Sequence, residues 1–129
     1  MSERYIIDAY AWVEYLIGSD SGKKVKAELE NDKSEIFTCT VTIAEVVSKT
    51  AREGRNVETA FEVLTSNSRI VDADQWLSRD AGQLHAQTNR KVKDFSLAHA
   101  YVLASARKLN ARILTGDPHF RELREATVI

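Results

Sequence analysis

Short apolar runs along this 129-residue chain alternate with longer stretches in which apolar residues recur at helical spacing. The runs are rich in β-branched residues and predict strands, and the longer stretches predict helices with one apolar face. The predicted strands are 5–7, 36–40, 69–71, 111–114 and 127–129. The predicted helices are 9–17, 21–30, 42–53, 57–64, 73–88, 96–109 and a short one at 120–125.

Strands separated by helices favour parallel pairing, because each crossover returns over a face of the sheet. We therefore expect a three-layer α/β/α sandwich with a mostly parallel sheet, formed by a single domain over residues 1–129. In such sheets functional groups collect beyond the carboxyl ends of the strands. Asp8 and Asp117 are each the first acid after an apolar strand, so they are the first candidates.

If the strands before Asp8 and Asp117 are neighbours, the two residues lie roughly 5 Å apart, the spacing between strands. Carboxylates at that separation repel each other unless a proton or a cation lies between them. Mg²⁺ and Mn²⁺ favour such oxygen ligands and promote hydrolysis of phosphodiesters. Taken singly, each acid has a structural explanation: Asp8 as a helix N-cap and Asp117 as part of a Gly-Asp-Pro turn.

Two residues on helices extend the candidate site. Glu45 lies three residues after Thr42, as in a capping box, and it points away from the apolar face of its helix. This placement fits a helix cap or a cleft wall. His99 shares a face with Val102 and Leu103, so it points inward, either as a core histidine or as a group lining a cleft.

Other polar and aromatic residues have simpler explanations. Asp94 is expected to cap the helix that contains His99, and His85 to be structural. His119 is near Asp117 and could approach a phosphate, but a surface turn is the preferred interpretation. Trp12 and Trp76 are interpreted as core or interface anchors, and Trp12, Tyr15 and Leu16 as a possible dimer surface. The single Cys39 cannot form an internal disulfide, which suits a cytoplasmic location.

Charge limits the classes of function. The net charge is −1, so binding of nucleic acid would depend on a local basic patch. Arg90, Lys91 and Lys93 form the densest basic cluster and are candidates for RNA-backbone contacts, or simply a solvated loop. No segment approaches the roughly 20 apolar residues of a membrane span.

Four blocks carry a family resemblance: YIIDAYAW at 5–12, TIAE at 42–45, DFSLAHAY at 94–101 and ILTGDPHF at 113–120. They resemble PIN-domain proteins, especially VapC-type toxins, over nearly the whole chain. The resemblance implies a sheet in the order 3-2-1-4-5 and RNA cleavage dependent on Mg²⁺ or Mn²⁺. It also implies homodimers and inhibition by a VapB-type antitoxin. The family's acids correspond to Asp8, Glu45 and Asp117.

One position departs from the family pattern, because His99 stands where the family has an acid. An imidazole suits Mn²⁺ better than Mg²⁺, so this departure implies a preference for Mn²⁺, weaker binding of a second ion, or loss of activity. The main hypothesis is an endoribonuclease with Asp8, Glu45 and Asp117 as metal ligands. His99 would be a substitute ligand or would position phosphate.

Two threonines would support these residues. Thr115 would orient Asp117 or a water molecule, and Thr42 would support Glu45. Two rival hypotheses stay open. The first is a PIN fold that binds RNA or an antitoxin without cutting. The second is a receiver-like domain phosphorylated on Asp8, although no lysine follows the fourth strand in the expected way.

Overall fold

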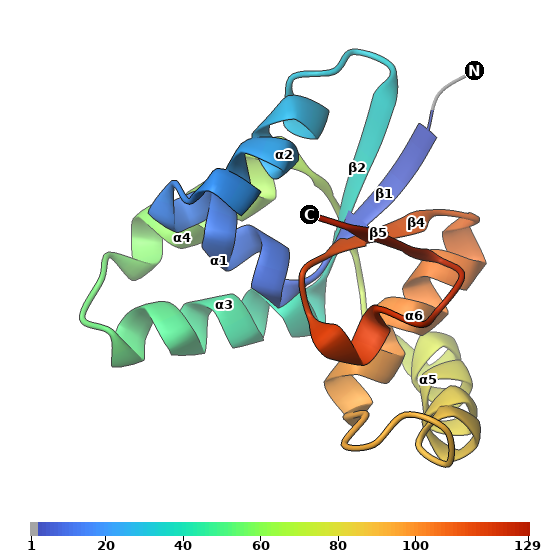
Figure 1. The fold of residues 1–129 in the computed structure, drawn as a ribbon. Coiled ribbons are helices and arrows are strands. Elements are labelled where there is room, and N and C mark those ends of the chain that lie inside the picture. The colour runs from blue at the N-terminus through green and yellow to red at the C-terminus, as the bar shows by residue number, and fades with distance from the viewer. Residues whose placement is uncertain (1–2) are drawn as a thin grey trace.

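Five parallel strands form one sheet in the order β3-β2-β1-β4-β5 in the computed structural model, which describes residues 3–129 (Figure 1). The predicted fold class and strand order are confirmed. The strands are β1 (Glu3–Ile7), β2 (Ser34–Cys39), β3 (Arg69–Val71), β4 (Arg112–Thr115) and β5 (Ala126–Val128).

Six α-helices and one short 3₁₀ helix connect the strands. They are α1 (Ala9–Ile17), α2 (Asp20–Leu29), α3 (Thr40–Arg52), α4 (Val57–Asn67), α5 (Gln75–Thr88), α6 (Leu97–Leu109) and η1 (Pro118–Phe120). None of the helices in the described part of the chain is long and apolar enough to cross a membrane.

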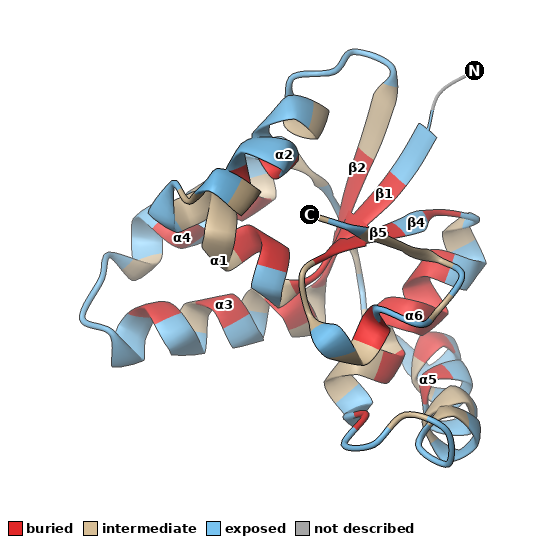
Figure 2. Ribbon diagram, viewed as in Figure 1, coloured by how far each residue is buried: buried red, intermediate tan, exposed pale blue. Residues whose placement is uncertain are grey.

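The sheet separates two apolar cores. Alternate residues of β1 point to opposite faces, so Ile6 packs with α5 and α6, whereas Ile7 packs with α1 to α4. The buried stretches in Figure 2 accordingly follow the three central strands, β2, β1 and β4, and the inward faces of the helices. Burial on both faces fixes the strand register, which places the ends of β1 and β4 side by side, with Ile7 opposite Leu114.

Several predicted helix ends and caps are wrong. Helix α3 begins at Thr40, two residues before the predicted start, and its N-cap is Cys39, which makes no side-chain capping bond. The Thr40 hydroxyl instead accepts a hydrogen bond from the Ala73 N–H at 3.0 Å. The predicted cap at Asp94 is also wrong, because Ser96 caps α6, and the short helix expected at 120–125 is replaced by η1.

Trp12 lies in the core, which was one of the two interpretations of the sequence, and not on an exposed dimer surface. Its side chain is fully buried in the core beneath α1, and its Nε1–H donates to Thr38 Oγ1 at 3.1 Å. Tyr15 and Leu16 are partly buried and pack against the same core. Trp12, the largest of the three side chains suggested for a homodimer surface, is therefore not available to a partner.

Candidate functional site

Asp8 lies at the carboxyl end of β1 and has two structural partners. Its Oδ1 accepts a hydrogen bond from the Ala11 N–H at 2.8 Å, which caps α1, and its Oδ2 accepts one from the Thr115 hydroxyl. Asp8 is buried. Burial raises the pKa of Asp8 to about 7, since the two hydrogen bonds and His99 offset only part of this effect and Asp117 adds to it.

Thr115 connects the ends of the two central strands. Its hydroxyl donates to Asp8 Oδ2, and its oxygen accepts the Asp117 N–H at 2.9 Å. Because Asp8 already follows the strand paired with β4, this one hydroxyl fixes the positions of both acids. Thr115 itself is fully buried, which excludes water from this contact.

Asp117 lies between two histidines. Its Oδ2 is 2.9 Å from His99 Nε2, and its Oδ1 is 2.6 Å from His119 Nδ1 and also accepts the His119 N–H at 2.8 Å. Burial alone would raise the pKa of Asp117, but the hydrogen bonds from both histidines outweigh it and hold that pKa well below its usual range. Asp117 is therefore a stable carboxylate at neutral pH.

The position of His99 is fixed by a capping box at the start of α6. Ser96 Oγ accepts the His99 N–H at 3.1 Å, and the Ser96 N–H donates to His99 Nδ1 at 2.9 Å. Aromatic contacts with Phe95 and Phe120, at centroid distances of 5.3 and 5.1 Å, hold the ring from two sides.

This capping box selects the tautomer of a neutral His99. Since Nδ1 accepts the Ser96 N–H, the ring proton is on Nε2, from which it donates to Asp117. In this state His99 has no free lone pair for a metal. It could become a ligand only by moving its proton to Nδ1, where Ser96 Oγ at 2.9 Å can accept it.

Glu45 lies on α3 and lines a cleft of about 860 Å³ between α1 and α3, which also includes Asp117. Although the residue is largely exposed, burial on its cleft side raises the pKa of Glu45. His99 lowers that pKa and Asp117 raises it. Glu45 is therefore electrostatically coupled to both residues across the cleft.

The predicted supporting role of Thr42 as a helix cap is wrong, because α3 has already begun at Thr40. Thr42 is fully buried on the face of α3 that also carries Val46 and Thr50. Its hydroxyl finds no hydrogen-bond partner within residues 3–129. Glu45 therefore depends on the position of its helix rather than on a capping box.

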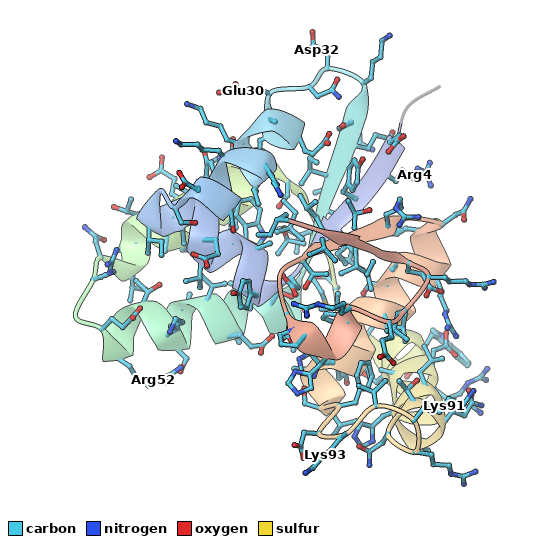
Figure 3. All side chains as sticks on the ribbon, viewed as in Figure 1. Arg4, Glu30, Asp32, Arg52, Lys91 and Lys93 are labelled. Carbon is cyan, nitrogen blue, oxygen red and sulfur yellow. The ribbon has the colours of Figure 1, made fainter. Side chains whose placement is uncertain are left out.

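The basic cluster lies in the turn between α5 and α6. Lys91 and Lys93, labelled in Figure 3, line a second hollow of about 430 Å³ together with His119, and Arg90 is not part of that lining. Asp94 in the same segment is exposed and has a left-handed backbone with φ of 59°. His85 is half-buried on α5, and its structural role stays a prediction.

The hydrogen bond between His119 and Asp117 was not predicted from the sequence, which favoured a surface turn for His119. The signal was the spacing in Asp117-Pro118-His119, where proline begins η1 and brings the imidazole back to the carboxylate two residues earlier. Within the described residues, His99, Asp117 and His119 each offer a possible metal-ligating atom, and these atoms lie within 4.8 Å of one another.

The donor set fits a divalent cation. Asp8 and Glu45 have raised pKa values, and Asp117 contributes to both increases. A cation between these carboxylates would stabilise their charged forms. Carboxylate oxygens suit Mg²⁺ and Mn²⁺, and His99 adds no ligand to them while its proton is on Nε2.

Known proteins share the sequence pattern and the fold of this chain. The sequence profile of the PIN domain family matches residues 5–126. A comparison with curated proteins gives no match.

Solved structures with the same fold include VapC20 from Mycobacterium tuberculosis, described as a sarcin–ricin loop cleaving toxin. It has a TM-score of 0.74 and 15% identity over 91% of this chain and 92% of that one. VapBC2 from Rickettsia felis, bound to a promoter DNA fragment, has a TM-score of 0.72 and 14% identity over 98% and 97%. A toxin–antitoxin complex from Klebsiella pneumoniae has a TM-score of 0.71 and 16% identity over 95% of both chains. At these identities the likeness establishes the fold.

Proposed function

This chain belongs to the PIN domain family, and from that premise we propose that it is a divalent-metal-dependent endoribonuclease. The observation that carries the proposal is the convergence of Asp8 and Asp117 at the ends of adjacent strands, with Glu45 facing Asp117 across the cleft. These acids come from three distant parts of the sequence. A structural role for each alone does not explain why they are electrostatically coupled.

Asp8, Glu45 and Asp117 would hold Mg²⁺ or Mn²⁺. The bound ion would supply a Lewis acid that activates water and neutralises charge on the phosphate. The protein's own contribution is to fix the carboxylates: Thr115 holds Asp8 and Asp117 together, and the two histidines orient the Asp117 carboxylate. With Nδ1 accepting from Ser96 and Nε2 donating to Asp117, neutral His99 has neither a lone pair for the ion nor a proton for the phosphate, so its role would be to orient Asp117.

We further propose that the protein is a VapC-type toxin controlled by a VapB-type antitoxin. Supporting this, the structural neighbours include VapBC complexes and a toxin described as cleaving the sarcin–ricin loop. Of the basic cluster, Lys91 and Lys93 line the hollow beside His119 and would contact the RNA backbone, whereas Arg90 does not line it. A homodimer, frequent in this family, is part of the same proposal.

The test is cleavage of labelled RNA by the purified protein with Mg²⁺ or with Mn²⁺. We expect cleavage that EDTA abolishes and that falls by at least a hundredfold in Asp8→Asn and in Asp117→Asn, because each loses a charged ligand. Arg4→Ala, far from the site at the opposite end of β1, is the matched control and should keep full activity. Cleavage that persists in both aspartate variants would come from a contaminant and would refute the proposal.

A second candidate function is suggested by His99, which stands where the family has an acid, and by His119 beside it. With two imidazoles hydrogen-bonded to Asp117, the protein could bind RNA or an antitoxin without cutting. Binding of RNA in the absence of any cleavage, with Mg²⁺ and with Mn²⁺, would support this binding function and exclude the nuclease.

A further inference from the structure

A hollow of about 430 Å³ lies next to the acidic cleft and differs from it in charge. We call it the His119 hollow; it is lined by Lys91, Val92, Lys93, Pro118, His119, Arg121 and Glu122. Asp117 lines the cleft and His119 lines the hollow, so the two meet at the turn that begins η1. A ligand in the hollow would therefore lie beside the Asp117 carboxylate.

The His119 hollow has an excess of positive charge. Lys91, Lys93 and Arg121 are opposed only by Glu122, whereas the cleft between α1 and α3 has four acidic and three cationic side chains. No salt bridge within residues 3–129 involves the three cations of the hollow, although Lys49 in the cleft lies 3.7 Å from Glu53. Cations without a protein partner, drawn from two segments, favour an anion such as a phosphate group.

His119 adds a second recognition element to the hollow. Its Nδ1 lies 2.6 Å from the Asp117 carboxylate, which can only accept, so the ring proton is on Nδ1. In the neutral ring the remaining nitrogen, Nε2, carries a lone pair, and it makes no hydrogen bond within the described residues. Such an acceptor beside cationic groups suits a hydroxyl donor attached to a phosphate-bearing ligand.

We propose that the His119 hollow binds one ribose–phosphate unit of an RNA strand, next to the bond that is cut. The phosphate contacts Lys91, Lys93 and Arg121, and the ribose 2′-hydroxyl donates a hydrogen bond to His119 Nε2. The position of the cut bond rests on the proposed nuclease function, but binding in the hollow does not. Since DNA lacks the 2′-hydroxyl, His119 would make the hollow selective for RNA.

The experiment measures binding of a short fluorescein-labelled single-stranded RNA, and of DNA of the same sequence, by fluorescence anisotropy in EDTA. His119→Asn keeps a donor near the position of Nδ1 and removes Nε2. It should weaken RNA binding by roughly fivefold, as expected for one hydrogen bond, and leave DNA binding unchanged. Arg121→Ala and Lys91→Ala should weaken both, each reducing the slope of log affinity against log salt by about 0.7.

Arg90→Ala is the matched control, because Arg90 is in the same turn but does not line the hollow. Its effect on binding should be much smaller than that of Lys91→Ala. An equal loss of RNA affinity in Arg90→Ala and Lys91→Ala would show that the turn attracts RNA through its general positive charge. That result would refute binding in the His119 hollow. Equal effects of His119→Asn on RNA and DNA would overturn the 2′-hydroxyl contact.

These outcomes are separable from the nuclease proposal. If RNA binds as described but is not cut with any divalent ion, the nuclease proposal fails and the hollow stands. If RNA is cut while the variants of the His119 hollow bind RNA like the wild type, the proposed binding site in the hollow is refuted and the nuclease proposal is supported.

Discussion

Asp8 and Asp117 are two aspartates at one site whose pKa values move in opposite directions. Asp8 is enclosed and receives hydrogen bonds from one N–H and one hydroxyl, so burial dominates and its pKa rises to about 7. Asp117 is more open and receives three N–H donors, two of them from imidazoles, so its pKa falls. Local hydrogen bonding, rather than residue type, decides which acid ionises easily.

The raised pKa of Asp8 predicts that Asp8 destabilises the folded protein increasingly as pH rises. Between its usual pKa of 3.8 and about 7, folded Asp8 keeps a proton that the unfolded chain has released, so the free energy of unfolding falls as pH rises through this window. Asp8→Asn stays neutral and should be more stable than the wild type at pH 8, by up to about 4 kcal/mol. Urea unfolding in EDTA should show this gain vanish near pH 4.

Asp117→Asn should behave in the opposite way in the same experiment. A lowered pKa stabilises the fold above the usual carboxyl pKa, and this contribution is lost as pH falls. The variant should therefore be less stable than the wild type at pH 7. Equal pH profiles for the two variants would contradict the assigned environments.

His99→Asp tests how the imidazole affects metal choice. The substitution adds a carboxylate beside Asp117 and Glu45 and removes a hydrogen bond that competes for Asp117. We expect Mg²⁺ to bind roughly tenfold tighter, measured by isothermal titration calorimetry. The control is His99→Asn, which removes the imidazole without adding charge. Unchanged Mg²⁺ affinity in His99→Asp would show that this position does not face the ion.

At the scale of elements, the contact between α1 and α2 depends on one glycine. A Cβ at Gly22 would lie 2.3 Å from the Glu14 carbonyl oxygen, so α2 can approach the end of α1 only without a side chain there. A Cβ at Gly82 on α5 would meet nothing within 4 Å. A side chain can therefore be accommodated at Gly82, whereas at Gly22 it would force the two helices apart.

Paired alanine substitutions should reveal this difference. Gly82→Ala should stabilise the protein by about 0.5–1 kcal/mol, because alanine loses less backbone entropy in a helix. Gly22→Ala should destabilise it by on the order of 2 kcal/mol or more, since backbone must move. Thermal unfolding of both variants measures the effect, and a gain in Gly22→Ala would show that α2 shifts freely.

Elements were more predictable from the sequence than their starting residues. The bounds of α1 and β3 agree with the pattern of apolar residues, because that pattern directly records burial. The cap of α6 was assigned to Asp94 instead of Ser96 because both residues have capping side chains. The backbone decides between them: Asp94 takes a left-handed conformation, while Phe95 enters the core.

The site was predictable where it depends on strand order. Asp8 and Asp117 could be paired because they end neighbouring parallel strands. The contacts of His99 and His119 with Asp117 were not predicted, because they depend on the capping box at Ser96 and on the turn at Pro118. Such contacts are set by tertiary placement of a few atoms, which periodicity does not record.

At the scale of the whole molecule, metal binding and folding should be linked. A cation that binds only the folded arrangement of Asp8, Glu45 and Asp117 raises the free energy of unfolding with its concentration. Millimolar Mn²⁺ should therefore raise the melting temperature by several degrees at pH 8. The shift should be smaller at pH 6, where Asp8 holds its proton. Asp117→Asn should show little shift at either pH, and a full shift there would place the ion elsewhere.

The hydrogen bond from the Thr115 hydroxyl to Asp8 joins two side chains that are 107 positions apart in the sequence. It can form only while β1 and β4 remain adjacent. Partial opening of the sheet at this pair would separate the two acids at once. In rising denaturant, catalysis should therefore disappear together with amide-exchange protection of β1, with no window in which a loosened protein still cuts.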